Sequence, residues 1–573
     1  MATFLYIYVP IVKYNKPFMR RLCICVCLAI LAGSAAHGAE KGFLKGKILK
    51  IDMEDMVAER GGSSFSVSLS GINTSSSVSL LSLERALEKA ADDNKIAMVY
   101  INTDRFSAGL AAMEEVREYL KRFSASGKPV VAYGAGFSNA SYYIASVADR
   151  VFLYPKGSGS LTGLGSTQFF LKDALDTLGI EVQLIRHGKY KSAGEMYIRN
   201  DISPENREQY ETMLNSIWNS FVEEMAASRG IEAETLKGWI DNLELNTADT
   251  WLKKGLIDGL KYRDEMEQYL CHLFGTTEPD KVKTVSVKEY IEDLKKGPSS
   301  KKIAVIYANG EITREGGDIV GEKLSNEIAK VRRDSSVKAV VFRVNSPGGE
   351  VVAADMIRRE IEVLKKYKPV IASYGSYAAS GGYLISAGCE KIFVDNATLT
   401  GSIGVFGMIP SFGKAIKKNL KVNPVSLGTG KHSTMGSGIA PLSPEEEAWY
   451  QQEIEGIYDD FVGVVAEGRS ITKEYVDSIA QGRVWAGSDA LRIKLADEKG
   501  TVLEAVKYAA EKAGLEKYRI EMVPEKKSMF QQLKDGDSKK KDNPLVRGLV
   551  RPGFSAIARM PYISIDSDNT LAK

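Results

Sequence analysis

The chain has 573 residues and nearly balanced charge, with 76 Lys and Arg against 73 Asp and Glu and a net charge of +3. This balance excludes a DNA-coating protein, which would carry a large basic excess, and the 44% of hydrophobic residues excludes a disordered chain. The length exceeds what one hydrophobic core usually fills, so we expect two or more domains. Only four histidines and five cysteines are present, and their placement supports neither a disulfide framework nor a zinc ribbon. Any catalysis must therefore use little imidazole.

The first 40 residues have the composition of an export signal. Arg20 and Arg21 precede an apolar run over residues 22–32, and small residues follow it. This order of basic, apolar and small residues is typical of a secretory signal, although the stretch is also just long enough for an uncleaved membrane anchor. Met19 stands where such a signal usually begins, so the start of translation stays open between Met1 and Met19. In either case we expect the body of the protein outside the cytoplasm.

Two stretches of the chain match each other at a nearly constant spacing. The segment that begins at Ser203-Pro204-Glu205 matches the one that begins at Ser443-Pro444-Glu445, 240 residues later. Each has Ser at a helix N-cap position and Pro at the first helical position, and Glu446 completes a capping box in the second. Repeated matches at one spacing indicate two copies of one domain. The predicted segments are a signal or anchor in 1–40, a first copy in 41–298, a second copy in 299–525 and a tail in 526–573.

Each copy is expected to alternate strands with helices. In the second copy, apolar runs at 303–307, 339–344 and 369–373 predict strands, and helical spacing at 324–331 and 353–367 predicts the helices between them. Strands alternating with helices of this length favour βαβ units, so the predicted fold class is α/β with mostly parallel sheets.

Two glycine pairs follow neighbouring strands of the second copy. Asn345-Ser346-Pro347-Gly348-Gly349 comes after one predicted strand, and Ala379-Ser380-Gly381-Gly382 comes after the next, at a helix start. Ligands bind at the carboxyl ends of parallel strands, and glycines let backbone N–H groups approach a developing negative charge. Ser380 is therefore a candidate nucleophile. Ordinary glycine turns with a serine N-cap are the alternative interpretation.

A serine nucleophile needs a base. His187 and His432 show no Asp partner in the sequence, so lysine is the alternative. The pKa of a lysine, about 10.4, must then fall toward neutrality, and burial among apolar groups can supply such a shift. The candidates are Lys189, Lys191 and Lys431, and spacing alone does not separate them. No histidine motif supports metal catalysis, and no cofactor is expected.

Beyond residue 525 the composition becomes basic and irregular. Lys526-Lys527 and residues 539–541 are basic, and residues 545–563 mix apolar side chains with arginines. The simplest interpretation is a flexible surface tail. A segment that lies on anionic lipid is the alternative.

From about residue 45 to about residue 520 the sequence resembles the long two-copy form of the signal peptide peptidase A family, peptidase family S49. In that family the nucleophile lies in an Ala-Ser-Gly-Gly-Tyr motif of the second copy, which here contains Ser380. The family's base is the lysine of a Tyr-Lys-Ser-Ala motif in the first copy, which here is Lys191. The resemblance further implies that Gly348, Gly349 and Gly381 donate to the oxyanion. It also implies that the hydroxyl of Ser402 orients the lysine amine.

The same resemblance implies a Clp-protease/crotonase-like fold in both copies and a serine endopeptidase with a Ser/Lys dyad. It implies a homotetramer attached to the bacterial inner membrane, with the catalytic body on the periplasmic, extracytoplasmic side. The expected substrates are signal peptides left in the membrane after export, and other membrane-embedded peptides. No nucleic-acid partner is expected.

The repeat suggests a division of labour between the copies. At the ungapped spacing Ser380 corresponds to Asn139, which cannot act as a nucleophile, and the first copy lacks the glycine pairs. We therefore hypothesise that the first copy lends Lys191 to the second. Two alternatives remain open: a register shifted by two residues pairs Ser141 with Ser380, and Lys431 matches Lys191 at the repeat spacing as a rival base.

Two other functions compete with a peptidase. A crotonase-type acyl-CoA enzyme shares the implied fold but works in the cytoplasm, which disagrees with the export signal. A non-catalytic scaffold that binds membrane proteins is disfavoured for the second copy by Ser380 and the glycines at 348 and 349. Labelling by a fluorophosphonate separates the first alternative from a serine peptidase.

Overall fold

The computed structural model describes residues 44–53, 57–68, 71–104, 106–293, 299–524 and 557–560. The expected signal or anchor lies outside these residues, as does most of the predicted tail. Within the part of the chain that is described, no helix combines the length and the apolar composition needed to span a membrane.

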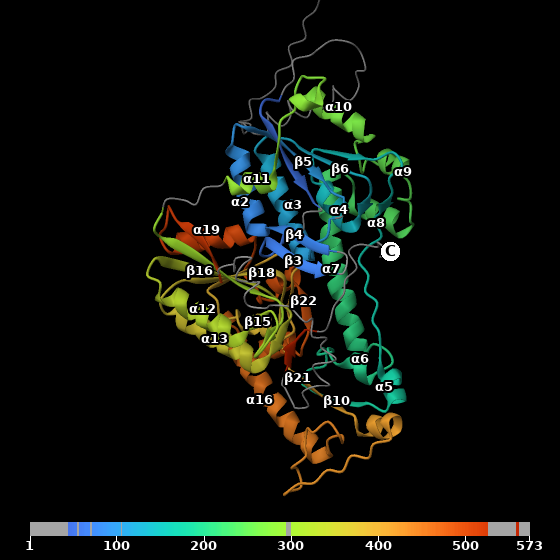
Figure 1. Ribbon diagram of the computed structural model, residues 1–573, viewed down its shortest axis with the longest axis vertical. Helices are drawn as coiled ribbons and strands as arrows, with labels where there is room; N and C mark the ends of the chain where they lie inside the picture. Colours follow the sequence, from blue (N-terminus) through green and yellow to red (C-terminus); the bar gives the residue numbers. More distant parts are fainter. Residues whose placement is uncertain are drawn as a thin grey trace, which may run out of the picture.

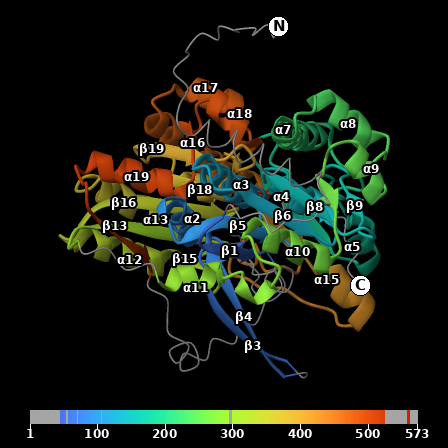
Figure 2. The ribbon, with the colours of Figure 1, turned by 90° about the horizontal axis from the view of Figure 1, so that it is seen from above.

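The first copy is built on a six-stranded sheet in which every neighbouring pair is parallel. Seen from above, β1, β5, β6 and β8 of this sheet lie side by side (Figure 2). In spatial order the strands are β11 (Gly259–Leu260), β8 (Arg150–Leu153), β6 (Val130–Gly134), β5 (Ile96–Asn102), β1 (Lys47–Asp52) and β12 (Thr284–Ser286).

The second copy repeats this topology strand by strand. Its parallel strands are, in the same spatial order, β23 (Glu498–Lys499), β19 (Lys391–Val394), β18 (Val370–Ala379), β16 (Val337–Ser346), β13 (Lys302–Asn309) and β24 (Arg519–Val523). The end of β18 also pairs with β20 (Leu399–Gly401), which pairs with the antiparallel β22 (Val484–Ala486). The matched order confirms the predicted tandem of α/β domains with mostly parallel sheets. The segment boundaries given above stay predictions.

Helices cover both faces of the second sheet (Figure 1). Successive residues of a strand point to opposite faces, and here Ile306 and Phe342 pack under two helices while Val305 and Val341 pack under a third. Because both faces are buried, the strands read as continuous apolar runs. The covering helices are α12 (Gly321–Arg333), α13 (Val351–Lys365) and α19 (Val502–Lys512).

Two long helices begin at the predicted Ser-Pro motifs. They are α7 (Pro204–Arg229) and α16 (Pro444–Arg469), and the side chains of Ser203 and Ser443 cap them. The predicted capping box at Glu446 is confirmed, since its carboxylate accepts the Ser443 N–H at 2.9 Å. These caps satisfy backbone N–H groups that a helix start leaves unpaired.

Smaller elements surround the two sheets. The hairpin of β3 (Gly62–Ser68) and β4 (Gly71–Ser79) projects from the body (Figure 2). Further helices are α2 (Leu80–Asp92), α3 (Leu110–Ala125), α4 (Asn139–Ala145), α5 (Lys172–Leu178), α6 (Glu195–Ile198), α8 (Ala233–Asp241), α9 (Ala248–Lys253), α10 (Arg263–Leu273), α11 (Val287–Glu292), α14 (Gly381–Leu384), α15 (Gly413–Ala415), α17 (Lys473–Ile479) and α18 (Gly487–Arg492).

A further sheet joins the two copies. β10 (Glu181–Arg186), from the first copy, pairs antiparallel with β21 (Phe406–Ser411), from the second, along its whole length. Arg186 lies opposite Phe406, so the residues after Arg186 enter the second copy near the carboxyl ends of its parallel strands. The first copy thus contributes a strand to a sheet of the second copy.

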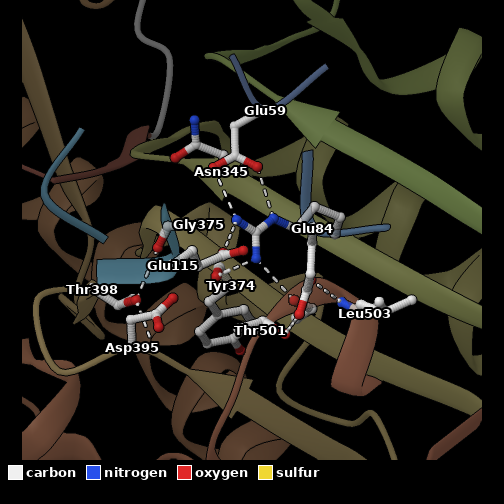
Figure 3. A network of polar contacts seen from close by, with 12 residues as sticks. Glu59, Glu84, Glu115, Asn345, Tyr374, Gly375, Asp395, Thr398, Thr501 and Leu503 are labelled. Atoms are coloured by element: carbon white, nitrogen blue, oxygen red, sulfur yellow. Dashed lines mark hydrogen bonds and ion pairs between the residues drawn. The ribbon is translucent and has the colours of Figure 1, made fainter. Parts of the chain in front are cut away.

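A buried network of charged side chains also joins the copies (Figure 3). Arg343 of β16 donates to both carboxylate oxygens of Glu59, at 2.7 and 3.0 Å, and to Glu115 at 2.5 Å. Glu59 and Glu115 belong to the first copy, whereas Arg343 belongs to the second and is only 1% exposed. Glu84 of α2 completes the network by accepting from the Thr501 hydroxyl of the second copy.

The described residues nearest the end of the chain, 557–560, include one short strand. Residues 557–559 form β25, which pairs antiparallel with β17 (Gly348–Glu350) and, at Ile557, with β21. The backbones of both neighbouring strands hold β25, so it does not need a hydrophobic face. The sequence around it therefore shows no alternating apolar pattern from which a strand could have been predicted.

Candidate active site

Ser380 lies in the turn between β18 and α14, at the carboxyl end of the second sheet. Its φ of 56° is positive, and a non-glycine residue in such a conformation costs about 1–3 kcal/mol unless its surroundings fix it. The surroundings do so here, since its N–H donates to the Gly401 carbonyl at 2.8 Å and its carbonyl accepts from Leu384 at 2.8 Å. The Ser380 side chain makes no capping hydrogen bond to α14, which disagrees with the interpretation as an ordinary N-cap.

The Lys191 amine lies next to this hydroxyl. Lys191 Nζ is 2.8 Å from Ser380 Oγ, 3.0 Å from Ser402 Oγ and 3.0 Å from the Ser402 carbonyl oxygen. Lys191 and Ser380 are both fully buried. The structure therefore brings together three residues that the sequence analysis singled out, one from the first copy and two from the second.

Burial lowers the pKa of Lys191 well below its usual value. No neighbouring carboxylate is among the causes that shift it, so the charged form has nothing to offset its lost hydration. A neutral amine has two N–H donors and one lone pair. The Ser402 carbonyl can only accept, which takes one N–H; the Ser402 hydroxyl can take the second. The lone pair is then available to the Ser380 O–H, which is the arrangement a general base needs.

Tight backbone packing from the second copy holds the loop that carries Lys191. The Tyr190 N–H donates to the Gln481 carbonyl at 2.9 Å. A side chain at Gly482 would come within 2.5 Å of Lys191 Cβ, and one at Gly188 within 2.4 Å of the Gln481 backbone. Because both glycines also have positive φ, only glycine fits at these two positions.

Positioning contacts of this kind escaped the sequence analysis. Gln209 Nε2 donates to the Tyr190 carbonyl at 3.2 Å, and Gln209 Oε1 accepts from Val484 N–H at 3.0 Å. Gln209 therefore ties the lysine loop of the first copy to β22 of the second. A lone glutamine inside α7 carries no signal in the sequence that would have revealed this role.

Two of the three predicted oxyanion glycines lie on β17, beside the nucleophile turn. Gly348 and Gly349 have φ of 103° and 157°, and a Cβ at Gly349 would fall 1.9 Å from the Ile312 carbonyl oxygen. The Gly348 N–H donates to Ser346 Oγ at 3.2 Å, a long bond that a stronger acceptor can replace. Gly381 opens α14, which has only four residues, so local N–H groups rather than a helix dipole must supply any stabilisation there.

The other candidate bases lie elsewhere. The side chain of Lys431 is 70% exposed and forms an ion pair with Glu445, and Lys189 is exposed beside the Tyr190 ring. Both histidines have acidic partners that the sequence analysis missed because they are Glu rather than Asp. His187 contacts Glu455 at 2.5 Å, and His432 contacts Glu446 at 2.9 Å.

In the corresponding turn of the first copy, the side chains make structural hydrogen bonds. The Asn139 side chain donates to the Gly163 carbonyl at 2.9 Å and accepts from Thr162 N–H at 2.9 Å. Ser141 and Ser138 form the capping box of α4. The hydroxyl of Ser141, the alternative counterpart of Ser380, is therefore part of a helix cap.

The sequence profile described as Peptidase family S49 matches residues 122–274 and 362–516, one stretch in each copy and together more than half of the chain. The first match contains Lys191, and the second contains Ser380 and Ser402.

Named relatives agree with this match. The chain is 35% identical to "Protease 4" of Haemophilus influenzae over 457 residues, 77% of this chain and 74% of that protein. It is 35% identical to "Putative signal peptide peptidase SppA" of Enterococcus faecium over 36% of this chain and 63% of that protein. Among solved structures, a Listeria monocytogenes ClpP1 mutant aligns with 17% identity and a TM-score of 0.25, covering 36% of this chain and 95% of that one, which is too weak to support an argument. The chain belongs to peptidase family S49, as a two-copy peptidase.

Proposed function

We propose that this peptidase is a serine endopeptidase in which Ser380 is the nucleophile and Lys191 is the general base. The observation that carries the proposal is the 2.8 Å contact between Lys191 Nζ and Ser380 Oγ inside the protein. The lowered pKa of the lysine supports it, because a base must be unprotonated to accept a proton.

The reaction begins when neutral Lys191 accepts the Ser380 proton and Ser380 Oγ attacks the scissile carbonyl. The carbonyl oxygen gains negative charge, and we assign its stabilisation to the N–H groups of Gly348 and Gly381, once Gly348 releases Ser346 Oγ. One such donor is worth about 3–4 kcal/mol in a comparable serine protease. Gly349 shapes the loop through its close approach to Ile312.

The second half of the reaction returns the proton. The Lys191 ammonium, held by the carbonyl and hydroxyl oxygens of Ser402, donates to the leaving amine as the peptide bond breaks. Water then gives a proton to Lys191 and hydrolyses the acyl-Ser380 ester by the same steps. Ser402 thereby acts as the positioning residue for the amine.

We further propose that the substrates are remnant signal peptides and other membrane-embedded peptides. A relative that carries the name signal peptide peptidase supports this class, as does the export-type composition of residues 1–40. The proposed place is the extracytoplasmic side of the bacterial inner membrane.

Two measurements test the activity and the substrate together. A fluorophosphonate is expected to label wild-type protein at Ser380, and Ser380→Ala is expected to abolish both labelling and hydrolysis, whereas the exposed Ser478→Ala is expected to keep both. Wild-type protein is expected to cut a synthetic signal peptide in detergent faster than the intact precursor. Labelling at another residue contradicts the nucleophile, and equal rates on both substrates contradict the substrate class. Acyl-CoA hydrolysis without peptide cleavage would favour the crotonase-type alternative.

We also propose the homotetramer. Apolar side chains are exposed in two adjoining segments at the lower end of Figure 1, around α5 and over residues 420–427. Val425 and Leu427 are 81% and 87% exposed, which is unusual for such residues unless a partner covers them. Light scattering is expected to give four times the chain mass, and Leu427→Asp is expected to lower it. A monomeric wild type would exclude the tetramer.

A further inference from the structure

One turn of the second copy contacts both the lysine loop and the residue that orients the amine. This supporting turn is residues 480–483, between α17 and β22. The Gln481 carbonyl accepts from the Tyr190 N–H of the lysine loop at 2.9 Å, and the Arg483 carbonyl accepts from the Ser402 N–H at 2.7 Å. The supporting turn therefore sets the distance between the two backbone segments that lie on either side of the amine.

Gln481 has a backbone conformation that glycine would adopt more easily. Its φ is 52°, in the left-handed region, and a residue with a side chain persists there when its surroundings fix it. The end of this side chain is held, because Gln481 Nε2 donates to Asp477 Oδ1 at 2.6 Å and to the Tyr458 hydroxyl at 3.3 Å. These side-chain contacts therefore offset the strain of the backbone and fix the shape of the supporting turn.

Tyr458 of α16 contacts both the supporting turn and the lysine loop. Its hydroxyl donates to Asp477 Oδ1 at 2.5 Å and accepts from the Gln481 N–H at 3.4 Å. Its ring stacks on the ring of His187, the residue that follows β10, with 3.6 Å between the ring centroids and 18° between the ring planes. One buried side chain thus fixes the start of the lysine loop through its ring and the supporting turn through its hydroxyl.

Two further contacts hold the His187 ring against Tyr458. The His187 N–H donates to the Val405 carbonyl at 3.1 Å, and His187 Nδ1 lies 2.5 Å from Glu455 Oε2, also on α16. Burial alone accounts for the lowered pKa of Lys191, so the carboxylates around Tyr458 act on the amine through position rather than through charge.

We propose that Tyr458 is a positioning residue of this peptidase, which holds the supporting turn against the lysine loop so that the Lys191 amine stays excluded from water and within reach of Ser380. This proposal rests on the proposed function, since it needs Lys191 as the base. A misplacement of about 1 Å can lower a rate by about 10²-fold. Because Tyr458 acts on the base rather than on the bound peptide, its loss is expected to lower kcat and to leave KM nearly unchanged.

A loosened lysine loop also has a signature in the pH profile. Water that reaches the amine hydrates its charged form, so the pKa of Lys191 rises toward the ordinary lysine value of about 10.4. Only the neutral amine accepts the serine proton, so the acidic limb of the kcat profile moves to higher pH. A variant that only destabilises the fold lowers the amount of active protein and leaves this limb in place.

The first test is Tyr458→Phe, which keeps the ring on His187 and removes the hydroxyl. This variant is expected to lower kcat about tenfold near neutral pH and to change KM by less than about twofold, with a deficit that shrinks as pH rises toward about 10. Tyr475→Phe is the matched control, because Tyr475 is exposed on α17 and its hydroxyl donates to the Ile493 carbonyl at 3.4 Å. The control is expected to match wild type in both constants and in the position of the acidic limb.

Gln481→Gly separates the backbone of the supporting turn from its side-chain contacts. Glycine adopts a φ of 52° without strain, so the turn can keep its shape while the contacts to Tyr458 and Asp477 are lost. This variant is expected to show the same lower kcat and the same displaced limb as Tyr458→Phe. Asp477→Ala is expected to do likewise, whereas Asp477→Asn keeps an oxygen acceptor for both donors and is expected to restore most of the wild-type rate.

The outcomes separate this role from the proposed function. A wild-type kcat in both Tyr458→Phe and Gln481→Gly would overturn the positioning role, and so would a lower kcat with an unmoved acidic limb, which indicates loss of folded protein. A change confined to KM would overturn it as well. If wild type does not hydrolyse peptides, or if Lys191→Met keeps its activity, the proposed function itself has failed. An active wild type that depends on Lys191, with an unaltered Tyr458→Phe, fails only the present proposal.

Discussion

Replacing Lys191 with methionine is expected to abolish peptide hydrolysis. Methionine has similar length and no basic atom, so the Ser380 hydroxyl would keep its pocket and lose the acceptor 2.8 Å away. General base catalysis typically contributes about 10²–10⁴-fold to a rate, and we expect a loss at the upper end, because no other base contacts Ser380 Oγ among the described residues. The measurement is kcat/KM on a fluorogenic peptide. The exposed Lys431→Met is the control, and loss of activity there with retention in Lys191→Met would reverse the assignment.

The pH dependence of the activity is a second test of Lys191 as the general base. Only the neutral amine can accept the serine proton, so activity is expected to rise with pH and to fall as pH drops through the lowered pKa of Lys191. The same shift affects stability. The unfolded lysine holds its proton up to about pH 10.4, whereas the buried lysine has lost it well below that. Its burial therefore costs stability that is regained as pH rises toward that value. Lys191→Met is expected to be more stable than wild type near neutral pH, and the difference is expected to shrink toward pH 10.

Replacing Arg343 with methionine is expected to destabilise the protein by about 3–5 kcal/mol, because the variant removes the cation that neutralises the buried carboxylates of Glu59 and Glu115. Burial disfavours the charge of Arg343, but the charges of Glu115 and Glu59 outweigh that effect and raise its pKa well above the usual value. The guanidinium is therefore charged at every accessible pH, and it spans the copies through bonds of 2.5–3.0 Å. Thermal and denaturant unfolding measure the loss. Arg359→Met, exposed on α13, is expected to cost less than about 0.5 kcal/mol. Equal melting temperatures for the two variants would contradict a structural role for the network.

The acidic side of this network makes the expected stability dependent on pH. Burial and the nearby charge of Glu115 raise the pKa of Glu84 to about 8, whereas the unfolded value is about 4.3. Between these values the folded state holds a proton that the unfolded state lacks, so this contribution to stability falls as pH rises through the window. Glu84→Gln keeps the shape and removes the titration, and it is expected to flatten that slope.

Local patterns explain why much of the fold could be predicted. The apolar runs at 303–307 and 339–344 lie within β13 and β16, and Ser-Pro marks the start of α7 and α16, because caps and two-faced burial act over a few residues. The third strand was predicted too short: β18 continues from Ser373 to Ala379, since its end pairs with β20. That extension depends on residues 22 positions later in the sequence, such as Leu399 opposite Tyr377.

The site residues likewise divide into those that local sequence patterns predict and those that depend on distant parts of the chain. Ser380 and its glycines could be found from local spacing, since a tight turn demands them. The base could not: nothing near Lys191 distinguishes it from Lys189, and only the family resemblance selected it. Its burial depends on β10 pairing with β21, more than 200 residues later, and on the close approach of Gly482. The strand at 557–559 was missed for the same reason, because its partners at Gly348 and Phe406 are distant in the sequence and pair with it through the backbone.

The pairing of β10 from the first copy with β21 from the second has a consequence for how activity responds to dilution. The amine and the hydroxyl belong to one polypeptide, so their encounter is a unimolecular event that was completed when the chain folded. If the proposed tetramer exists and dissociates on dilution, this pair would stay intact within each chain. An enzyme that borrowed its lysine from another molecule would instead lose activity steeply as its concentration fell. Because both parts lie in one chain, the contact between Lys191 and Ser380 is expected to be independent of protein concentration.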